Sequence, residues 1–174
     1  MNTLDAIKLR HSTRAFDPAK QISDEDLNDI LFAGAQAAIG CADFDSLKLY
    51  AVQDPELLAE IDLSSANGNP NAHPVYHAPT LVVVAAKKGF LENIELSNAG
   101  CIIQNMMVMA ADRNIDSVYL WMAMMGVNKS EEIQKKLGFP EGYTCVGTCA
   151  LGYAEKPFPK LKAGEQRLET KIIR

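Results

Sequence analysis

A short polar segment near the N-terminus carries the side chains best suited to chemistry. It reads Arg-His-Ser-Thr-Arg-Ala-Phe over residues 10–16. Guanidinium groups present forked donors that suit phosphate and carbonyl oxygens, and a serine hydroxyl can complete such an anion cradle. If the backbone is extended, Arg10, Ser12 and Arg14 share one face. The segment therefore fits a local anion site, although the residue types alone favour a simpler interpretation, a solvated surface turn.

Two other pairs of reactive residues do not require a metal site or a redox site to explain them. His73 and His77 offer half of a zinc site in a loop, with no third ligand evident nearby, so we expect no metal. Cys145 and Cys149 would share one face of a strand, where core packing is the better explanation. We expect all four cysteines to be reduced and buried. The sequence has no Gly-x-Gly-x-x-Gly or Gly-Lys-Ser/Thr loop, so any nicotinamide cofactor would bind as a substrate.

Bulk properties limit the classes of protein to consider. A chain of 174 residues suits one domain, which we expect to span 1–174, and its 48% hydrophobic and 22% charged content is ordinary for a globular fold. A net charge of -5 argues against a general nucleic-acid binder. The charged N-terminus lacks the apolar core of an export signal, and the apolar run 101–111 is interrupted and too short to span a membrane. We therefore expect a cytoplasmic protein with no membrane partner.

The hydrophobic spacing predicts helices separated by strands. Ser23 and Asp54 suit helix N-caps, and Gly138 suits a helix stop. The expected helices cover 4–9, 24–39, 55–61, 92–113 and 130–137, and the expected strands cover 47–52, 80–86, 117–121 and 144–151. The loop 62–79 is unusually long for a connection inside a compact domain, and such loops are often functional. The pattern predicts a mixed α+β fold, with an extended C-terminal tail that could pack on a partner subunit.

The motif Arg10-x-Ser12-x-Arg14-x-Phe16, placed after a short helix, resembles the opening signature of the nitroreductase family of flavoproteins. Other segments match in the same order along nearly the whole chain. They are the helix 27–38, the strand 47–52, the Ala78-Pro79 entry to an apolar strand, the long central helix, and the segments 137–143 and 151–153. Arg167 resembles the family's late phosphate-binding arginine. Only the opening motif is specific, and the others support it by their order.

The resemblance implies a nitroreductase-like fold, with a central mixed or antiparallel sheet flanked by helices and a C-terminal tail that reaches across a dimer. It implies a homodimer that binds FMN between its subunits. The flavin would take hydride from NAD(P)H and reduce a nitroaromatic, a quinone or a related small acceptor in a ping-pong sequence. The cofactor performs the hydride chemistry, so no catalytic side chain is required.

The resemblance also implies roles for particular residues. Arg10, His11 and Ser12 would hold the phosphate of FMN, together with Arg167. Arg14 would lie near the pyrimidine edge, where its charge favours the reduced flavin. Asn67 would bond the pyrimidine, with Asn69 as a close competitor. The backbone segment that lies against the flavin and donates to its N5 would comprise Tyr119, Leu120, Trp121 and Met122.

The sequence departs from the family pattern at several positions. Where relatives carry a Pro-Ser-x-x-Asn-x-Gln-Pro-Trp-like stretch, Asp43 and Asp45 replace the Asn and the Gln. Trp121 stands where Glu or Gly is usual, and Glu165 stands where a basic residue is usual. These departures leave two alternatives open: a protein of the same fold that binds or regulates with lost or altered flavin chemistry, or a flavoenzyme with specialised chemistry such as dehalogenation or flavin breakdown.

Overall fold

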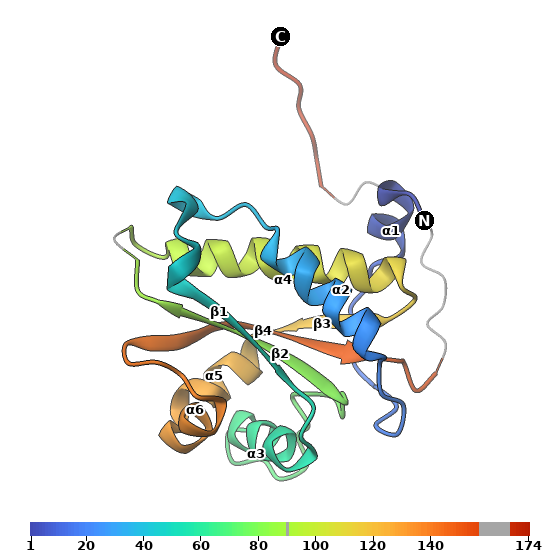
Figure 1. Cartoon of the computed structure of the whole chain (residues 1–174). Coiled ribbons are helices and arrows are strands. Elements are labelled where there is room, and N and C mark those ends of the chain that lie inside the picture. The colour runs from blue at the N-terminus through green and yellow to red at the C-terminus, as the bar shows by residue number, and fades with distance from the viewer. Residues whose placement is uncertain (90, 157–167) are drawn as a thin grey trace.

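The computed structural model describes residues 1–89, 91–156 and 168–174 (Figure 1). Within these residues the central sheet has four strands in the order β1-β2-β4-β3, and each neighbouring pair is antiparallel. The strands are β1 (Leu47–Val52), β2 (Thr80–Lys87), β3 (Asp116–Leu120) and β4 (Tyr143–Gly152). The predicted α+β class is confirmed, and the sheet is antiparallel.

Helices cover both faces of the sheet (Figure 1). On one face lie α1 (Thr3–Leu9), α2 (Asp24–Ala35) and α4 (Ile94–Asp112). On the other lie α3 (Pro55–Ser65), α5 (Trp121–Lys129) and α6 (Glu131–Leu137). Two short 3-10 turns, η1 (Gly40–Ala42) and η2 (Phe44–Ser46), lead into β1. The chain thus forms three layers with the sheet in the middle.

Local capping signals set several helix ends, as predicted. The Ser23 hydroxyl accepts from the backbone N–H of Asp26 at 3.1 Å, and an Asp54 oxygen accepts from that of Leu57 at 2.8 Å. Gly138 ends α6 with φ of 73°, a left-handed conformation that glycine adopts at low cost. Two helix ends differ from the prediction by more than two residues: α2 ends at Ala35 and α3 continues to Ser65. Part of the expected loop 62–79 is therefore helical.

The two layers of helices create two hydrophobic cores that share the sheet. In β2, Val82 and Val84 pack with the α2 and α4 side chains, whereas Leu81 and Val83 pack with the α3, α5 and α6 side chains. All four side chains are fully buried. This confirms that the apolar run at 80–86 is a strand buried on both faces.

A β-bulge in β4 overturns one expectation about the cysteines. The register between β2 and β4 shifts between Val84 and Ala85, so that Val146 is an extra residue on β4. Cys145 consequently faces the α3 side and Cys149 the α4 side. The expected shared face was wrong, because one inserted residue inverts the alternation of side chains along the strand.

The helix α5 was not anticipated from the sequence. The strand expected to include Trp121 ends at Leu120, and Trp121 begins the helix. This helix lies against α3 at Gly126, where an added Cβ would lie 2.8 Å from the backbone nitrogen of Ser65. Only glycine permits so close an approach of the two helices. In the part of the chain that the structure describes, no helix is both long and apolar enough to cross a membrane.

The four cysteines divide into two classes. Cys145 and Cys149 are buried, as expected, whereas Cys41 and Cys101 are exposed, contrary to expectation. Cys41 lies in the η1 turn, and Cys101 lies on the outward side of α4. An apolar sequence neighbourhood did not distinguish the two classes, because burial depends on which side of an element faces the sheet.

The buried thiols should resist alkylation in the native protein. Burial raises the pKa of Cys145 and of Cys149 to about 12, so both stay protonated at pH 8, and the thiolate is the reactive form. Iodoacetamide labelling at pH 8 followed by peptide mass spectrometry should find neither one modified, and should find both modified after denaturation in guanidinium. As a control, a Cys41→Ser, Cys101→Ser variant should be inert until denatured. Rapid native labelling of Cys145 or Cys149 would contradict the burial.

Candidate functional site

The segment 10–16 lies along the outer edge of the sheet. Ser12 forms a parallel bridge with Ser117 of β3, and the Thr13 N–H donates to the Ser117 carbonyl at 3.1 Å. Phe16 forms an antiparallel bridge with Ala154, just beyond β4. Thr13 and Phe16 are each 2% exposed, which anchors the segment. The segment is thus fixed to the sheet by two isolated bridges and is not a loose surface turn.

Burial of the two anchors leaves the polar side chains of this segment accessible. Arg10, which caps α1, and Ser12 are partly exposed, and Arg14 is exposed. After Thr13 the segment turns toward the residues that follow β4, where the Ala15 carbonyl accepts from the Glu155 N–H at 3.0 Å and Phe16 bridges Ala154. Because Asp116 pairs with Gly152, this turn leads past the start of β3, away from Tyr119. Ser12 thus lies at the start of β3, with Arg10 two residues before it and the exposed Arg14 two residues after it, so a hydroxyl and guanidinium groups are available for an anion cradle.

His11 is engaged within the chain. Its Nδ1 lies 2.9 Å from the carbonyl oxygen of Leu9, and its Nε2 lies 2.9 Å from Oδ1 of Asp116. Both ring nitrogens therefore have protein partners close by. The expected contact of His11 with a phosphate stays a prediction, and the imidazole's visible role is to join the segment to β3.

Asp116 is a residue that sequence reasoning missed. It begins β3, and its carboxylate meets the N-terminal segment and the end of β4. A single acid before a short strand carries no local signal of this role. Its partners lie far away in the sequence.

The turn from β3 into α5 brings the next group of candidate residues to the same edge. Leu120 is buried, Tyr119 is half-buried, and Trp121 and Met122 are exposed to 53% and 36%. Burial, helped by the Cys145 and Cys149 thiols, raises the pKa of Tyr119, so its phenol stays neutral. Leu120 is the N-cap of α5 and offers no capping side chain. The first N–H groups of the helix thus lack a side-chain acceptor and can bind an electron-rich ligand atom.

Asn67 lies elsewhere. It follows α3 in a left-handed conformation with φ of 51°, and its side-chain oxygen accepts a hydrogen bond from Lys129. Lys129 ends α5, whereas Trp121 begins it, and eight residues of helix span about 12 Å. The structure therefore brings Asn67 to the far end of α5 and does not place it beside the β3–α5 turn. Asn69 is also exposed.

The stretch 39–47, where the family pattern is broken, lies at the opposite edge of the sheet. It forms η1 and η2 and leads into β1, whereas the segment 10–16 runs beside β3 (Figure 1). Asp43, Phe44 and Asp45 are exposed there. Within one chain these carboxylates cannot repel an anion held by Arg10, because the whole sheet separates them. Only a second copy could bring the two regions together.

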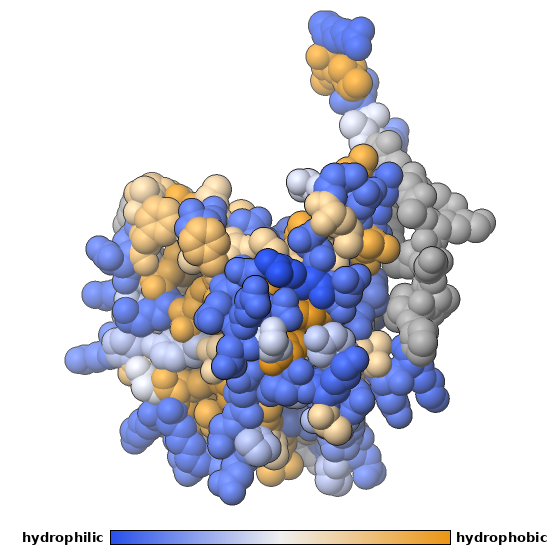
Figure 2. Space-filling view, turned by 45° about the vertical axis from the view of Figure 1, so that its right-hand side comes forward, coloured by the Kyte–Doolittle hydropathy of each residue, from blue (hydrophilic) through white to orange (hydrophobic). Residues whose placement is uncertain are grey.

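The C-terminal candidate Arg167 lies outside the described residues. The described end of the tail, 168–174, extends away from the body (Figure 1). Figure 2 shows its hydrophobic side chains standing clear of the body, and Ile172 and Ile173 are 73% and 86% exposed. Exposed isoleucines at the end of an extended segment are typical of a segment that packs on another protein surface.

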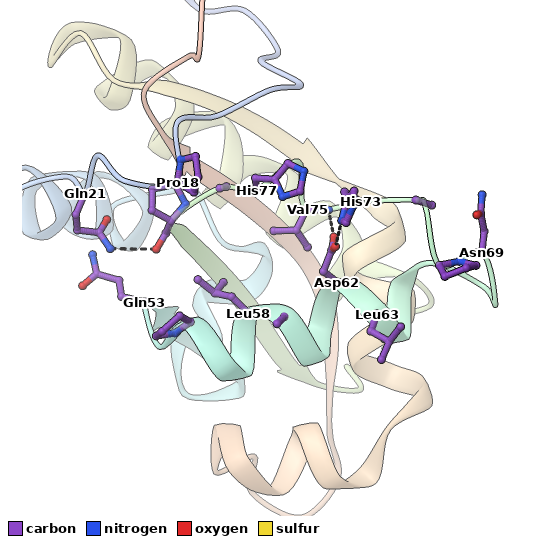
Figure 3. A pocket seen from close by; sticks show the side chains of 16 residues that line it. Pro18, Gln21, Gln53, Leu58, Asp62, Leu63, Asn69, His73, Val75 and His77 are labelled. Carbon is purple, nitrogen blue, oxygen red and sulfur yellow. Dashed lines mark hydrogen bonds and ion pairs between the residues drawn. The ribbon is translucent and has the colours of Figure 1, made fainter.

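A separate cleft of about 580 Å³ opens between α3 and the segment 69–79 (Figure 3). Leu58, Val75 and several prolines form its apolar wall. Asp62 accepts from the Val75 N–H at 2.8 Å and lies 2.9 Å from Nδ1 of His73, whose ring lies 4.2 Å from that of His77. Both Asp62 oxygens are therefore engaged with the chain. Among the described residues, no group of three or more His, Cys, Asp or Glu is placed to hold a metal ion.

Comparison with known proteins relates this geometry to a family. The family model described as the nitroreductase family matches residues 7–153. The structure is similar to a nitroreductase with bound FMN from Bacteroides fragilis, with a TM-score of 0.81 and 29% identity, covering 99% of this chain and 99% of that chain. It is also similar to a nitroreductase with bound FMN from Desulfitobacterium hafniense, with a TM-score of 0.84 and 25% identity, covering 98% of this chain and 99% of that chain.

An FMN-dependent nitroreductase from Clostridium difficile shares the fold, with a TM-score of 0.78, 21% identity, and coverage of 99% of this chain and 98% of that chain. No curated protein sequence matches this chain. The family match covers the edge segment from Arg10 to Phe16, the whole sheet and the β3–α5 turn. The chain belongs to the nitroreductase family.

Proposed function

We propose that this chain, acting as one domain over 1–174, is an FMN-dependent oxidoreductase whose cofactor binds between the subunits of a homodimer. The observation that carries the proposal is the segment 10–16, which is bound to the start of β3, the strand that leads into the uncapped start of α5. It supplies cationic and hydroxyl donors at the start of β3, and the first turn of α5 supplies backbone donors without a side-chain cap after the end of that strand. The similar nitroreductases from B. fragilis and D. hafniense have bound FMN.

The donors present fit the groups of FMN. Arg10 and Ser12 would hold the phosphate, joined by Arg167, because guanidinium and hydroxyl donors form strong hydrogen bonds with phosphate oxygens. The exposed Arg14 would stand near the pyrimidine edge, and its charge favours extra electron density there. The N–H groups at the start of α5 would donate to the flavin ring. Asn67 reaches this site only if the pyrimidine end extends toward the Lys129 end of α5.

When bound, FMN supplies the redox chemistry: it accepts a hydride, with its two electrons, from NAD(P)H and then passes two electrons to a nitroaromatic, a quinone or a related acceptor. The residues of the chain bind and orient the cofactor and the substrates. The exposed Trp121 indole lies at the start of α5, where a flat aromatic molecule could stack on it. No side-chain acid or base is required.

A homodimer would complete the site. Exposed apolar residues line one side of α1, with Leu4 and Ile7 at 58% and 49% exposure, and Leu9 at the end of the helix is 48% exposed. Next to them α1, α2 and α4 form a groove of about 500 Å³. Figure 2 shows hydrophobic side chains on the surface around this upper region. A second copy could cover this face and bring its 39–47 stretch to the site.

The absorption spectrum of the freshly purified protein tests the proposed activity. We expect flavin bands, an FMN mass in the released ligand, bleaching of the bands when NADH or NADPH is added without oxygen, and their return when a quinone or nitrofurazone is added. A colourless protein that does not bind added FMN would instead favour the binding or regulatory alternative. Return of the bands only with a halogenated phenol would point to specialised chemistry.

The phosphate role of Arg10 gives a binding prediction. Arg10→Ala removes a charge-assisted hydrogen bond, which should weaken FMN binding by about 1.5 to 3 kcal/mol. Trp121 is the single tryptophan of the chain, so quenching of its fluorescence can report FMN binding to the apoprotein. Lys8→Ala, which removes a nearby exposed charge from α1, is the matched control and should leave the affinity unchanged. Equal affinities in the wild type and Arg10→Ala would remove Arg10 from the site.

The dimer gives a separate prediction. Ile7→Glu places a charge on the exposed apolar side of α1, so it should turn a dimer into a monomer with weak FMN binding. Light scattering coupled to size-exclusion chromatography measures the mass. Lys8→Glu, one residue away, should remain dimeric. A wild-type monomer that retains FMN would contradict the interfacial site.

A further inference from the structure

Asp116 holds three parts of the chain together at the sheet edge. Its Oδ1 lies 2.9 Å from His11 Nε2 and accepts from the Thr13 hydroxyl at 3.3 Å. Its Oδ2 accepts from the Ala154 N–H at 2.7 Å. The side chain is only 20% exposed. One carboxylate thus links the N-terminal segment, the start of β3 and the end of β4.

The location of this carboxylate is unexpected for an anion site. Asp116 touches the residues on either side of Ser12, and Ser12 is proposed to bind phosphate. A negative charge at such a place should repel the phosphate and weaken its binding. Both oxygens of Asp116, however, face donors of the chain. Its charge is therefore offset locally by the Thr13 hydroxyl and the Ala154 N–H.

We propose that Asp116 is a positioning residue for the cofactor: it fixes the segment 10–14 in the conformation that presents Arg10 and Ser12 to the phosphate. This inference rests on the proposed function. Asp116 contacts the segment at two residues: the buried Thr13, through its hydroxyl, and the partly exposed His11, through its imidazole. A segment that is already ordered before the ligand binds loses less conformational entropy on binding, which favours affinity.

Asp62 provides a matched control. Like Asp116, it accepts from a distant backbone N–H, that of Val75, and it pairs with an imidazole, that of His73. Its side chain is 18% exposed, close to the value for Asp116. It belongs to α3 and lines the cleft there, whereas Asp116 begins β3. The two residues share their chemistry and differ in which segment they hold.

The substitution Asp116→Asn distinguishes a positioning role from a purely electrostatic one, because the two roles predict opposite changes in FMN affinity. If Asp116 acted only as a nearby negative charge, the neutral amide would tighten FMN binding. If Asp116 positions the segment, the mismatched amide should weaken FMN binding about tenfold, which corresponds to about 1.4 kcal/mol. Asp62→Asn should leave FMN affinity unchanged. Affinity is measured by Trp121 fluorescence on apoprotein, alongside circular dichroism and thermal unfolding to establish that each variant is folded.

Combination with Arg10→Ala tests whether the effect acts through the segment. Asp116→Asn should cost less FMN affinity in an Arg10→Ala background than in the wild type, because the contact being positioned is already lost. A full tenfold loss in both backgrounds would show a general structural effect and overturn the proposal. So would tighter or unchanged FMN binding in Asp116→Asn while Arg10→Ala weakens it. If Arg10→Ala itself has no effect, the proposed phosphate site fails instead.

Thr13→Val keeps the proposal testable if Asp116→Asn does not fold. Valine has the shape of threonine without the hydroxyl that donates to Asp116, and it changes no charge. We expect FMN affinity to fall about threefold, less than in Asp116→Asn, because Thr13→Val removes one hydrogen bond of Asp116 and leaves the carboxylate in place. Unchanged affinity in a folded Thr13→Val variant, with Asp116→Asn unfolded, would overturn the positioning role.

Discussion

The pairing of residues 10–16 with the outer edge of β3 is the constraint on which the candidate site depends. An unpaired edge exposes a row of backbone donors and acceptors, and the N-terminal segment satisfies part of that row through Ser12, Thr13 and Ser117. Burial of Thr13 and Phe16 fixes the segment in place, and Asp116 ties it to the end of β4. Arg10 and Ser12 are thereby held at the start of β3, and α5 begins after the other end of that strand.

The sheet order explains why one chain carries only part of such a site. The edge segment lies beside β3, and the divergent stretch around Asp43 and Asp45 leads into β1, so the two occupy opposite edges of the same sheet. No movement of a loop can bring them together while β2 and β4 remain between them. The proposed homodimer would solve this geometric problem by bringing one edge close to the opposite edge of another copy. The acidic substitutions would then act across the interface.

Tight packing on the α3 side supports the same region. Gly126 lets α5 lie directly on the end of α3, and the Ser64 hydroxyl donates to the Gly126 carbonyl at 2.9 Å. Asn128 exchanges two hydrogen bonds with the backbone of Cys145, which ties α5 to β4. These contacts fix the direction of α5. They therefore also fix the position of its first N–H groups and of Trp121 at the end of β3.

The sequence by itself determined the features that depend on nearby residues. The caps at Ser23 and Asp54, the stop at Gly138 and the buried strand β2 each follow from a few consecutive side chains, and the motif from Arg10 to Phe16 carried the family resemblance. Tertiary structure decided what depends on residues far apart in the chain. The bulge at Val146 reversed the face of Cys145, and α5 formed without a capping residue because α3 and β4 hold it. Asp116 gained its role from partners more than 30 positions away, because local patterns record the preferences of a segment but not which distant segment it meets.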